Sequence, residues 1–168
     1  MISSRSLPDR QTIQGLANRY PELDIPSVET CLAFLDTTTA FYEAVDAYFA
    51  QFGLSRGKFT LLMQLVEADE AGLLPSEFAE RAGVTRATVT SLLDGLEREQ
   101  LVTRQPHPSD RRMLSVHMTE KGRALMNEIL PDHFCRTKDL MAQLSDREKK
   151  TLIKLLNKLQ AGIPALYP

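Results

Sequence analysis

A change of hydrophobic period within residues 85–118 constrains the fold more than any other feature of the sequence. At first, apolar residues recur every three or four positions, which is the spacing of one helix face. They are Val89, Leu92, Leu93 and Leu96. Apolar residues then recur at every second position, at Leu114, Val116 and Met118, which is the alternation of a β-strand. The chain therefore passes from a short helix into a small β-hairpin.

A second short helix precedes this one, and the two meet at a glycine. Residues 75–82 open with a proline, which suits the first turn of a helix, and Thr85 can cap the helix that follows. A helix-turn-helix needs a small residue where its helices approach, a turn residue that accepts positive φ, and a branched apolar residue that locks the second helix. Ala79, Gly83 and Val89 fill these places, so we predict a helix-turn-helix.

The outer face of the second helix is polar. With the apolar stripe turned to the core, a rotation of roughly 100° per residue places small side chains outside. They are Ala87, Thr90, Ser91 and Asp94, flanked by Arg86 and Thr88. Small side chains let the backbone approach base edges and phosphates, and the helix N-terminus adds partial positive charge. We predict DNA contacts from Arg86, Thr88, Thr90 and Ser91, the alternative being an ordinary solvated face.

The hairpin carries a group of cations. Arg111 and Arg112 stand at its proline-delimited tip, and Arg104 lies on its outgoing strand. A projecting arginine finger of this kind can enter a minor groove, where narrow A-tract geometry attracts arginine. Asp110 can hold one of these arginines in a single orientation. We predict that these four residues act together at DNA, the alternative being a merely soluble hairpin tip.

Helical patterns flank this segment on both sides, so the predicted fold class is mainly α with a small β-hairpin wing. Apolar spacing and caps predict helices over residues 28–53, 55–71, 119–143 with a kink at Pro131, and 145–162. The last carries an apolar stripe of Leu152, Leu155, Leu156 and Leu159. Residues 1–27 contain three prolines and are expected to form an arm with one short helix near residues 12–20.

The charge of the chain is unevenly distributed. A net charge of −2 over 168 residues argues, by itself, against a nucleic-acid binder covered in positive charge. Residues 1–80 carry a net charge of −7, whereas residues 81–123 carry +3 and residues 124–168 carry +2. The segment of the predicted helix-turn-helix and wing is therefore locally positive, and the acidic part can lie away from a duplex.

Other classes of site have little support in the sequence. Cys31 and Cys135 form neither a disulfide framework nor a zinc spacing, which favours a reducing cytoplasm. His133 and Cys135 lie two positions apart on a predicted helix, so their side chains diverge and cannot share a metal ion. We find no signal peptide and no run of the roughly 18–20 apolar residues that a membrane span needs. We expect neither export nor membrane insertion, and no metal or cofactor.

Four segments together resemble the winged helix-turn-helix of the MarR (multiple antibiotic resistance regulator) family. They are the run from Leu74 to Thr90, Leu96-Glu97-Arg98, Ser109-Asp110-Arg111-Arg112 and Met118-Thr119-Glu120-Lys121-Gly122. The likeness extends over about residues 30–160 and leaves residues 1–27 outside the common pattern. Leu74 stands where a capping serine or threonine is usual, so the helix over 75–82 is expected to be less well capped.

The resemblance implies a homodimer. Residues 28–53 and 120–168 would form its dimerisation helices, and residues 54–119 its DNA-binding lobe. The helix after Thr85 would lie in the major groove and the wing in the minor groove, with Arg112 as the wing arginine and Asp110 as its aspartate. The resemblance also implies repression relieved by a small ligand, often a phenol or an aromatic carboxylate, or by cysteine oxidation. The leucine stripe of residues 145–162 supports dimerisation independently, because an elongated monomer leaves it unburied.

Cys31 is the candidate redox residue. It lies 22 residues before Gly53, a position resembling that of the reactive cysteine in the family's organic-hydroperoxide sensors. Those sensors support the thiolate with tyrosines, and Leu35 and Val45 stand at the corresponding positions here. We therefore expect Cys31 to be a packed, inert core cysteine.

The start of the helix over residues 55–71 is the candidate effector site. Arg56, Phe59 and Met63 combine a cation with aromatic and flexible apolar surface, which suits an aromatic carboxylate. Ordinary core packing is the alternative for the last two.

The predicted function is that of a dimeric, cytoplasmic transcriptional repressor that binds a pseudo-palindromic operator in double-stranded DNA and is released by a small phenolic or aromatic carboxylate effector. One alternative is a regulator that senses organic hydroperoxides through Cys31, and a more distant one is a thiol redox enzyme. The sequence offers no C-x-x-C and no glycine-rich phosphate loop, so we predict that the protein is not an enzyme. A winged helix used only for protein contacts is a third reading.

Arg112→Ala tests the assignment of the wing. We expect this variant to weaken operator binding sharply while its melting temperature stays nearly unchanged, because an exposed arginine at a hairpin tip contributes to binding rather than to the core. Fluorescence anisotropy with labelled duplex and thermal unfolding measure the two effects. Unaltered operator affinity would refute the assignment.

Overall fold

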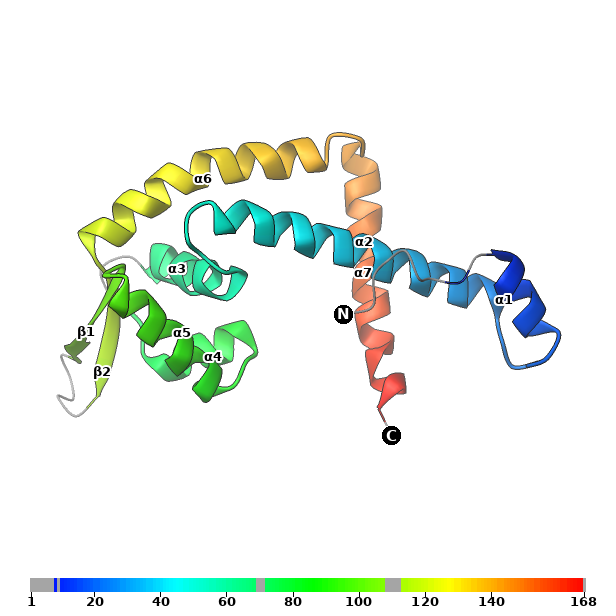
Figure 1. Ribbon diagram of the computed structural model, residues 1–168, viewed down its shortest axis with the longest axis horizontal. Coiled ribbons are helices and arrows are strands. Elements are labelled where there is room, and N and C mark those ends of the chain that lie inside the picture. The colour runs from blue at the N-terminus through cyan, green and yellow to red at the C-terminus, as the bar shows by residue number, and fades with distance from the viewer. Residues whose placement is uncertain (1–7, 9, 69–71, 108–112, 168) are drawn as a thin grey trace.

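A computed structural model describes residues 8, 10–68, 72–107 and 113–167 of the chain. Over these residues the chain forms helices and one two-stranded antiparallel hairpin, as predicted (Figure 1). The elements are α1 (Arg10–Ala17), α2 (Ile25–Ala50), α3 (Arg56–Ala68), α4 (Pro75–Ala82), α5 (Arg86–Arg98), β1 (Val102–Pro106), β2 (Leu114–Met118), α6 (Glu120–Leu140), α7 (Asp146–Gly162) and a 3-10 helix (Ile163–Leu166).

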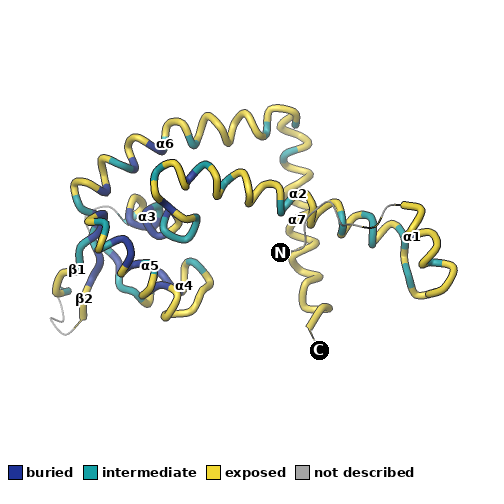
Figure 2. Tube along the Cα trace, in the orientation of Figure 1, coloured by how far each residue is buried: buried dark blue, intermediate teal, exposed yellow. Residues whose placement is uncertain are grey.

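The molecule consists of a compact lobe with long helices that project from it (Figure 1). Helices α3, α4 and α5 and the hairpin form the lobe, and the C-terminal end of α2 and the N-terminal half of α6 join it. Helix α2 has 26 residues, hence a length of about 39 Å, and it carries α1 at its far end. Figure 2 shows buried residues concentrated in the lobe, whereas the projecting helices are largely exposed.

The core of the lobe is built on the apolar stripe of α5. Val89, Leu93 and Leu96 of α5 are fully buried and pack with Phe78 of α4 and Leu62 of α3. The predicted helix-turn-helix is confirmed in its parts. Helix α4 ends at a left-handed residue, Gly83 with φ +63°, and the Thr85 hydroxyl accepts a hydrogen bond from the Thr88 N–H at 3.2 Å.

The hairpin has the predicted pairing but differs in detail. Val102 pairs with Met118 and Pro106 with Leu114, so β1 extends two residues beyond the predicted strand. Leu114 is exposed rather than inward, and the neighbouring Ser115 is buried. The Ser115 hydroxyl donates to the Gln105 carbonyl at 3.3 Å and lies 2.8 Å from His117 Nε2, so this buried polar group is satisfied.

Several helix boundaries depart from prediction for local reasons. Helix α2 begins at Ile25 rather than at residue 28, because Pro26 sits in the first turn, where no intrahelical hydrogen bond is lost, and Asp24 caps the end. Helix α4 lacks a side-chain cap from Leu74, as expected, but Glu77 Oε2 accepts from the Leu74 N–H at 2.6 Å. Pro131 lies inside α6 without ending it, and α6 stops at Leu140, before the predicted residue 143.

The first turn of α6 makes the closest approach to the lobe. The Thr119 hydroxyl accepts from the Gly122 N–H at 3.0 Å and donates to the Gln100 carbonyl at 2.7 Å. A β-carbon on Gly122 would lie 2.2 Å from the Leu101 carbonyl oxygen. The Thr-x-x-Gly signature thus has a physical cause: threonine caps α6 and ties it to α5, and only glycine admits the Leu101 backbone.

Gly122→Ala should destabilise the protein by about 2 kcal/mol or more, because the obstacle is backbone that cannot rotate aside. Urea unfolding followed by circular dichroism gives the difference in free energy. Gly162→Ala is the matched control, since a β-carbon there meets no described atom within 4 Å. Equal stability of the two variants would contradict this account of the motif.

Candidate nucleic-acid interface

The outer face of α5 is exposed as predicted. Arg86, Thr88, Thr90 and Ser91 are all accessible, while Val89 between them is fully buried. Burial of one stripe therefore fixes the rotation of the helix about its axis and decides which side chains a ligand meets.

In the N-terminal half of this face, the internal hydrogen bonds are made by threonine hydroxyls. The Thr88 and Thr85 hydroxyls lie 2.9 Å apart, and Thr90 Oγ1 donates to the Arg86 carbonyl at 2.9 Å. The guanidinium groups of Arg86 and Arg98, by contrast, make no hydrogen bond or ion pair with any described residue. Both are available to an anionic ligand.

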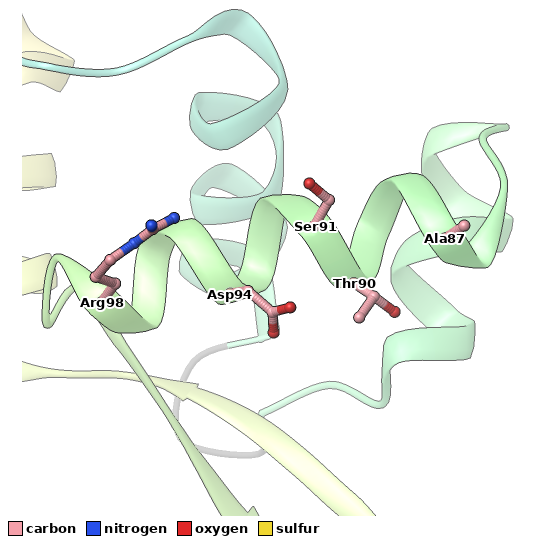
Figure 3. Close-up of a pocket in the computed structure, with 5 residues that line it drawn as sticks. All are labelled: Ala87, Thr90, Ser91, Asp94 and Arg98. Atoms are coloured by element: carbon pink, nitrogen blue, oxygen red, sulfur yellow. The ribbon is translucent and has the colours of Figure 1, made fainter.

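A shallow groove of about 680 Å³ runs along this face (Figure 3). It is lined by Ala87, Thr90, Ser91, Asp94 and Arg98, all from α5. Arg98 was missed as a contact by sequence reasoning, although a signal was present: Ala87, Ser91, Asp94 and Arg98 follow helical spacings of four, three and four. This stripe brings a cation to the C-terminal end of the face.

Arg104 does not project freely from the hairpin. Its Nη2 donates to Asp94 Oδ1 at 2.6 Å and its Nη1 to Glu97 Oε2 at 2.8 Å. Only about a quarter of its side chain is exposed, at 24%. The guanidinium thus bridges β1 to α5, and its predicted role at DNA stays untested.

The other predicted wing residues, Asp110, Arg111 and Arg112, lie outside the described residues. The strands that flank them are described: β1 ends at Pro106 and β2 begins at Leu114.

The three predicted effector residues each contact other side chains of the protein. Arg56 donates from Nε to Asp46 Oδ1 at 2.6 Å, and its guanidinium carbon lies 3.9 Å from the centre of the Tyr42 ring. Phe59 is buried and stacks on Phe49 with ring centres 4.0 Å apart. Met63 is half-buried against the core. Arg56 therefore serves the α2–α3 contact, and Phe59 has the core role given as its alternative.

An aromatic cluster that sequence reasoning missed lies where α2, α3 and α6 meet. The half-buried His133 ring is 5.1 Å from Phe59 and 6.1 Å from Tyr48, on which it stacks. Arg136 lies over the Tyr48 ring at 5.1 Å and donates to Asp132 at 2.6 Å. Burial, and then the neighbouring Asp132, raise the pKa of Tyr48, and the hydrogen bond from Arg136 is the main cause of a lowered pKa at Asp132. A helical spacing of Asp132, His133 and Arg136 was the available signal.

The expectation that Cys31 is packed in the core is wrong for this chain. Both Cys31 and Cys135 are exposed, because the N-terminal part of α2 and the C-terminal part of α6 project beyond the lobe. No group of three metal-ligating side chains occurs among the described residues.

Helix α7 has no buried residue within this chain. Its predicted stripe of Leu152, Leu155, Leu156 and Leu159 is 38–55% exposed. None of the described helices is both long and apolar enough to span a bilayer. Because these leucines are exposed, the stripe is an apolar face that no described residue of this chain covers.

Comparison with known proteins bears on this geometry. A family model described as MarR family matches residues 52–113, which hold the helix-turn-helix and the first strand of the hairpin, β1, but not β2. The HTH-type transcriptional repressor YetL of Bacillus subtilis (strain 168) is 39% identical over 155 residues, covering 92% of this chain and 93% of YetL. At most 13 residues lie outside that alignment, so at least 14 of residues 1–27 are shared with YetL. The family model begins only at residue 52, so the expectation that residues 1–27 lie outside the family's common pattern stays a prediction.

Two solved structures share the fold. The S. aureus MepR–DNA complex has a TM-score of 0.70 at 22% identity and covers 79% of this chain and 95% of MepR. CouR from Rhodococcus jostii RHA1, bound to p-coumaroyl-CoA, has a TM-score of 0.66 at 22% identity and covers 82% of this chain and 92% of CouR.

Proposed function

Because the chain belongs to the MarR family of transcriptional regulators, we propose that it is a homodimeric repressor that binds a pseudo-palindromic DNA operator and releases it on binding a small effector. Its relatives are transcriptional regulators, so the alternative of a thiol redox enzyme is wrong. A DNA-bound regulator of this kind acts in the cytoplasm.

The exposed polar face of α5 is the observation that carries the proposal. Arg86 at one end and Arg98 at the other have unengaged guanidinium groups, and Thr88, Thr90 and Ser91 lie between them. Cations at the two ends suit the phosphates along a groove, and short hydroxyl side chains in the middle suit base edges. We assign α5 as the recognition helix, with the wing residues Arg111, Arg112 and Asp110 at the adjacent minor groove.

The unburied helices support a homodimer. Over the described residues, apolar side chains of α7 remain exposed, as do Phe34, Leu35 and Phe41 of α2. A second copy would cover these faces and place two recognition helices about 34–36 Å apart, one turn of DNA. Pseudo-palindromy of the operator follows from that symmetry.

Two observations support an aromatic or phenolic acid as effector. The contact between α2, α3 and α6 is lined by Tyr48, Phe59 and His133 with Arg136 beside them, which offers ring surface and a cation. The structural relative CouR was solved with p-coumaroyl-CoA. Arg56 is retained as the predicted carboxylate partner, and it would have to leave Asp46 to act as one.

Oxidation of Cys31 is the second candidate trigger. The thiol is exposed, which access to a hydroperoxide requires. It has no tyrosine at the two positions where the family's sensors carry one, so we rank it below the aromatic effector.

Operator binding is tested with duplex from immediately upstream of the protein's own gene. We expect a dimer to bind it with an affinity that falls as salt rises. If Arg86 and Arg98 of two protomers each neutralise one phosphate, the double variant R86A/R98A should flatten the slope of log K against log salt by about 3–4. Anisotropy titrations at several salt concentrations and analytical ultracentrifugation measure slope and assembly.

Lys150→Ala is the matched control, because this exposed cation lies on α7, away from the recognition helix. The interface would be refuted if the slope of log K against log salt is unchanged in R86A/R98A, or if wild-type affinity does not depend on salt concentration.

The effector is tested by release of bound operator. Salicylate or p-coumarate should weaken binding by roughly 5–150-fold, the usual range of coupling between two sites. Arg56→Ala should lose this response while keeping basal affinity, with Met63→Leu as a control that retains the volume of the side chain. Release by cumene hydroperoxide instead, abolished in Cys31→Ser, would overturn the aromatic effector in favour of redox sensing.

A further inference from the structure

The recognition helix carries acidic groups that a DNA-binding surface does not ordinarily present. Asp94 lines the groove along α5, and Glu97 lies one turn further on. Their side chains are 55% and 39% exposed. Facing the phosphates of a duplex, two unpaired carboxylates per protomer would oppose binding through like-charge repulsion.

Arg104 contacts both of these carboxylates with separate nitrogens. The distances are 2.6 Å to Asp94 Oδ1 and 2.8 Å to Glu97 Oε2, which are lengths of charge-assisted hydrogen bonds. Arg104 belongs to β1, and three quarters of its side chain is buried. Its guanidinium is therefore held in place by the packing of the hairpin. One guanidinium thus engages both carboxylates and offsets one of their two negative charges, whereas Arg98 on the same face pairs with no described residue.

We infer that Arg104 is an internal counter-ion of the recognition helix: it holds Asp94 and Glu97 in place and offsets part of the negative charge that α5 would otherwise bring to DNA. This inference rests on the proposed function and deepens it, since it makes Arg104 a positioning residue rather than a phosphate contact. Arginine suits the task better than lysine, because its planar fork reaches two carboxylates at once.

The test is a mutant cycle on operator binding. Arg104→Gln should weaken affinity by on the order of ten- to a hundredfold, because two protomers each expose two carboxylates to phosphate. D94N/E97Q keeps the shapes of both side chains without their charge, and it should bind at least as tightly as the wild type. Adding R104Q to the D94N/E97Q variant should then lower operator affinity by less than about threefold. D94N and E97Q are also made singly, each with and without R104Q. Circular dichroism checks that every variant is folded.

Two other roles for Arg104 predict different results, and each would overturn the inference. If Arg104 contacts DNA directly, R104Q lowers operator affinity by the same factor in the wild type and in the D94N/E97Q background. If the ion pairs serve only to hold the hairpin against α5, D94N/E97Q alone loses affinity. An R104Q variant that binds like the wild type also refutes the inference. Failure of the wild type to bind any duplex, by contrast, refutes the proposed function itself.

Discussion

The contact between the first turn of α6 and residues 99–101, which follow α5, fixes where α6 joins the lobe. Gly122 lies against the Leu101 carbonyl, and Thr119 caps α6 while its hydroxyl donates to Gln100. Lys121 Nζ adds a hydrogen bond to the Glu99 carbonyl at 2.8 Å. Gln100 takes a left-handed conformation, with φ +61°, to turn the chain into β1 at this point. The start of α6 is therefore anchored to the chain segment that directly follows α5.

A second connection runs through α3. Lys58 forms an ion pair with Glu99, the residue that follows α5, while Arg56 on the same helix pairs with Asp46 of α2. On its other side α3 presents Phe59 to Phe49 and His133. The aromatic cluster and the recognition helix thus share α3 and α6 as neighbours. On the proposed function, an effector bound between α2 and α6 would act on helices whose contacts reach the end of α5 at Glu99 and Gln100.

The sequence was sufficient for the parts of this fold that depend on local chemistry. Periodicity in α5, the glycine after α4 and the threonine caps each act within a few residues, and each was predicted correctly. What the sequence could not show depends on distant residues. Cys31 belongs to an apolar stripe, yet it is exposed among the described residues. Arg104 looked like a free cation, but it pairs with Asp94 and Glu97. Pattern identifies which face of a helix is apolar, but not whether this chain or another molecule buries it.

The distribution of charge over α5 explains how a chain of net charge −2 can address DNA at all. What a duplex meets is the local field, in which exposed charges more than about 10 Å away are largely screened at 0.1 M salt. Near the groove, the carboxylates of Asp94 and Glu97 are engaged by Arg104, whereas Arg86 and Arg98 have no partner among the described residues. Among the described residues of this face, two cations are therefore free for phosphate under the proposed function, which predicts a small sequence-independent part of the affinity. On the proposed function, the hydroxyls of Thr88, Thr90 and Ser91 would contribute correspondingly more, and such contacts favour a matched operator over random DNA.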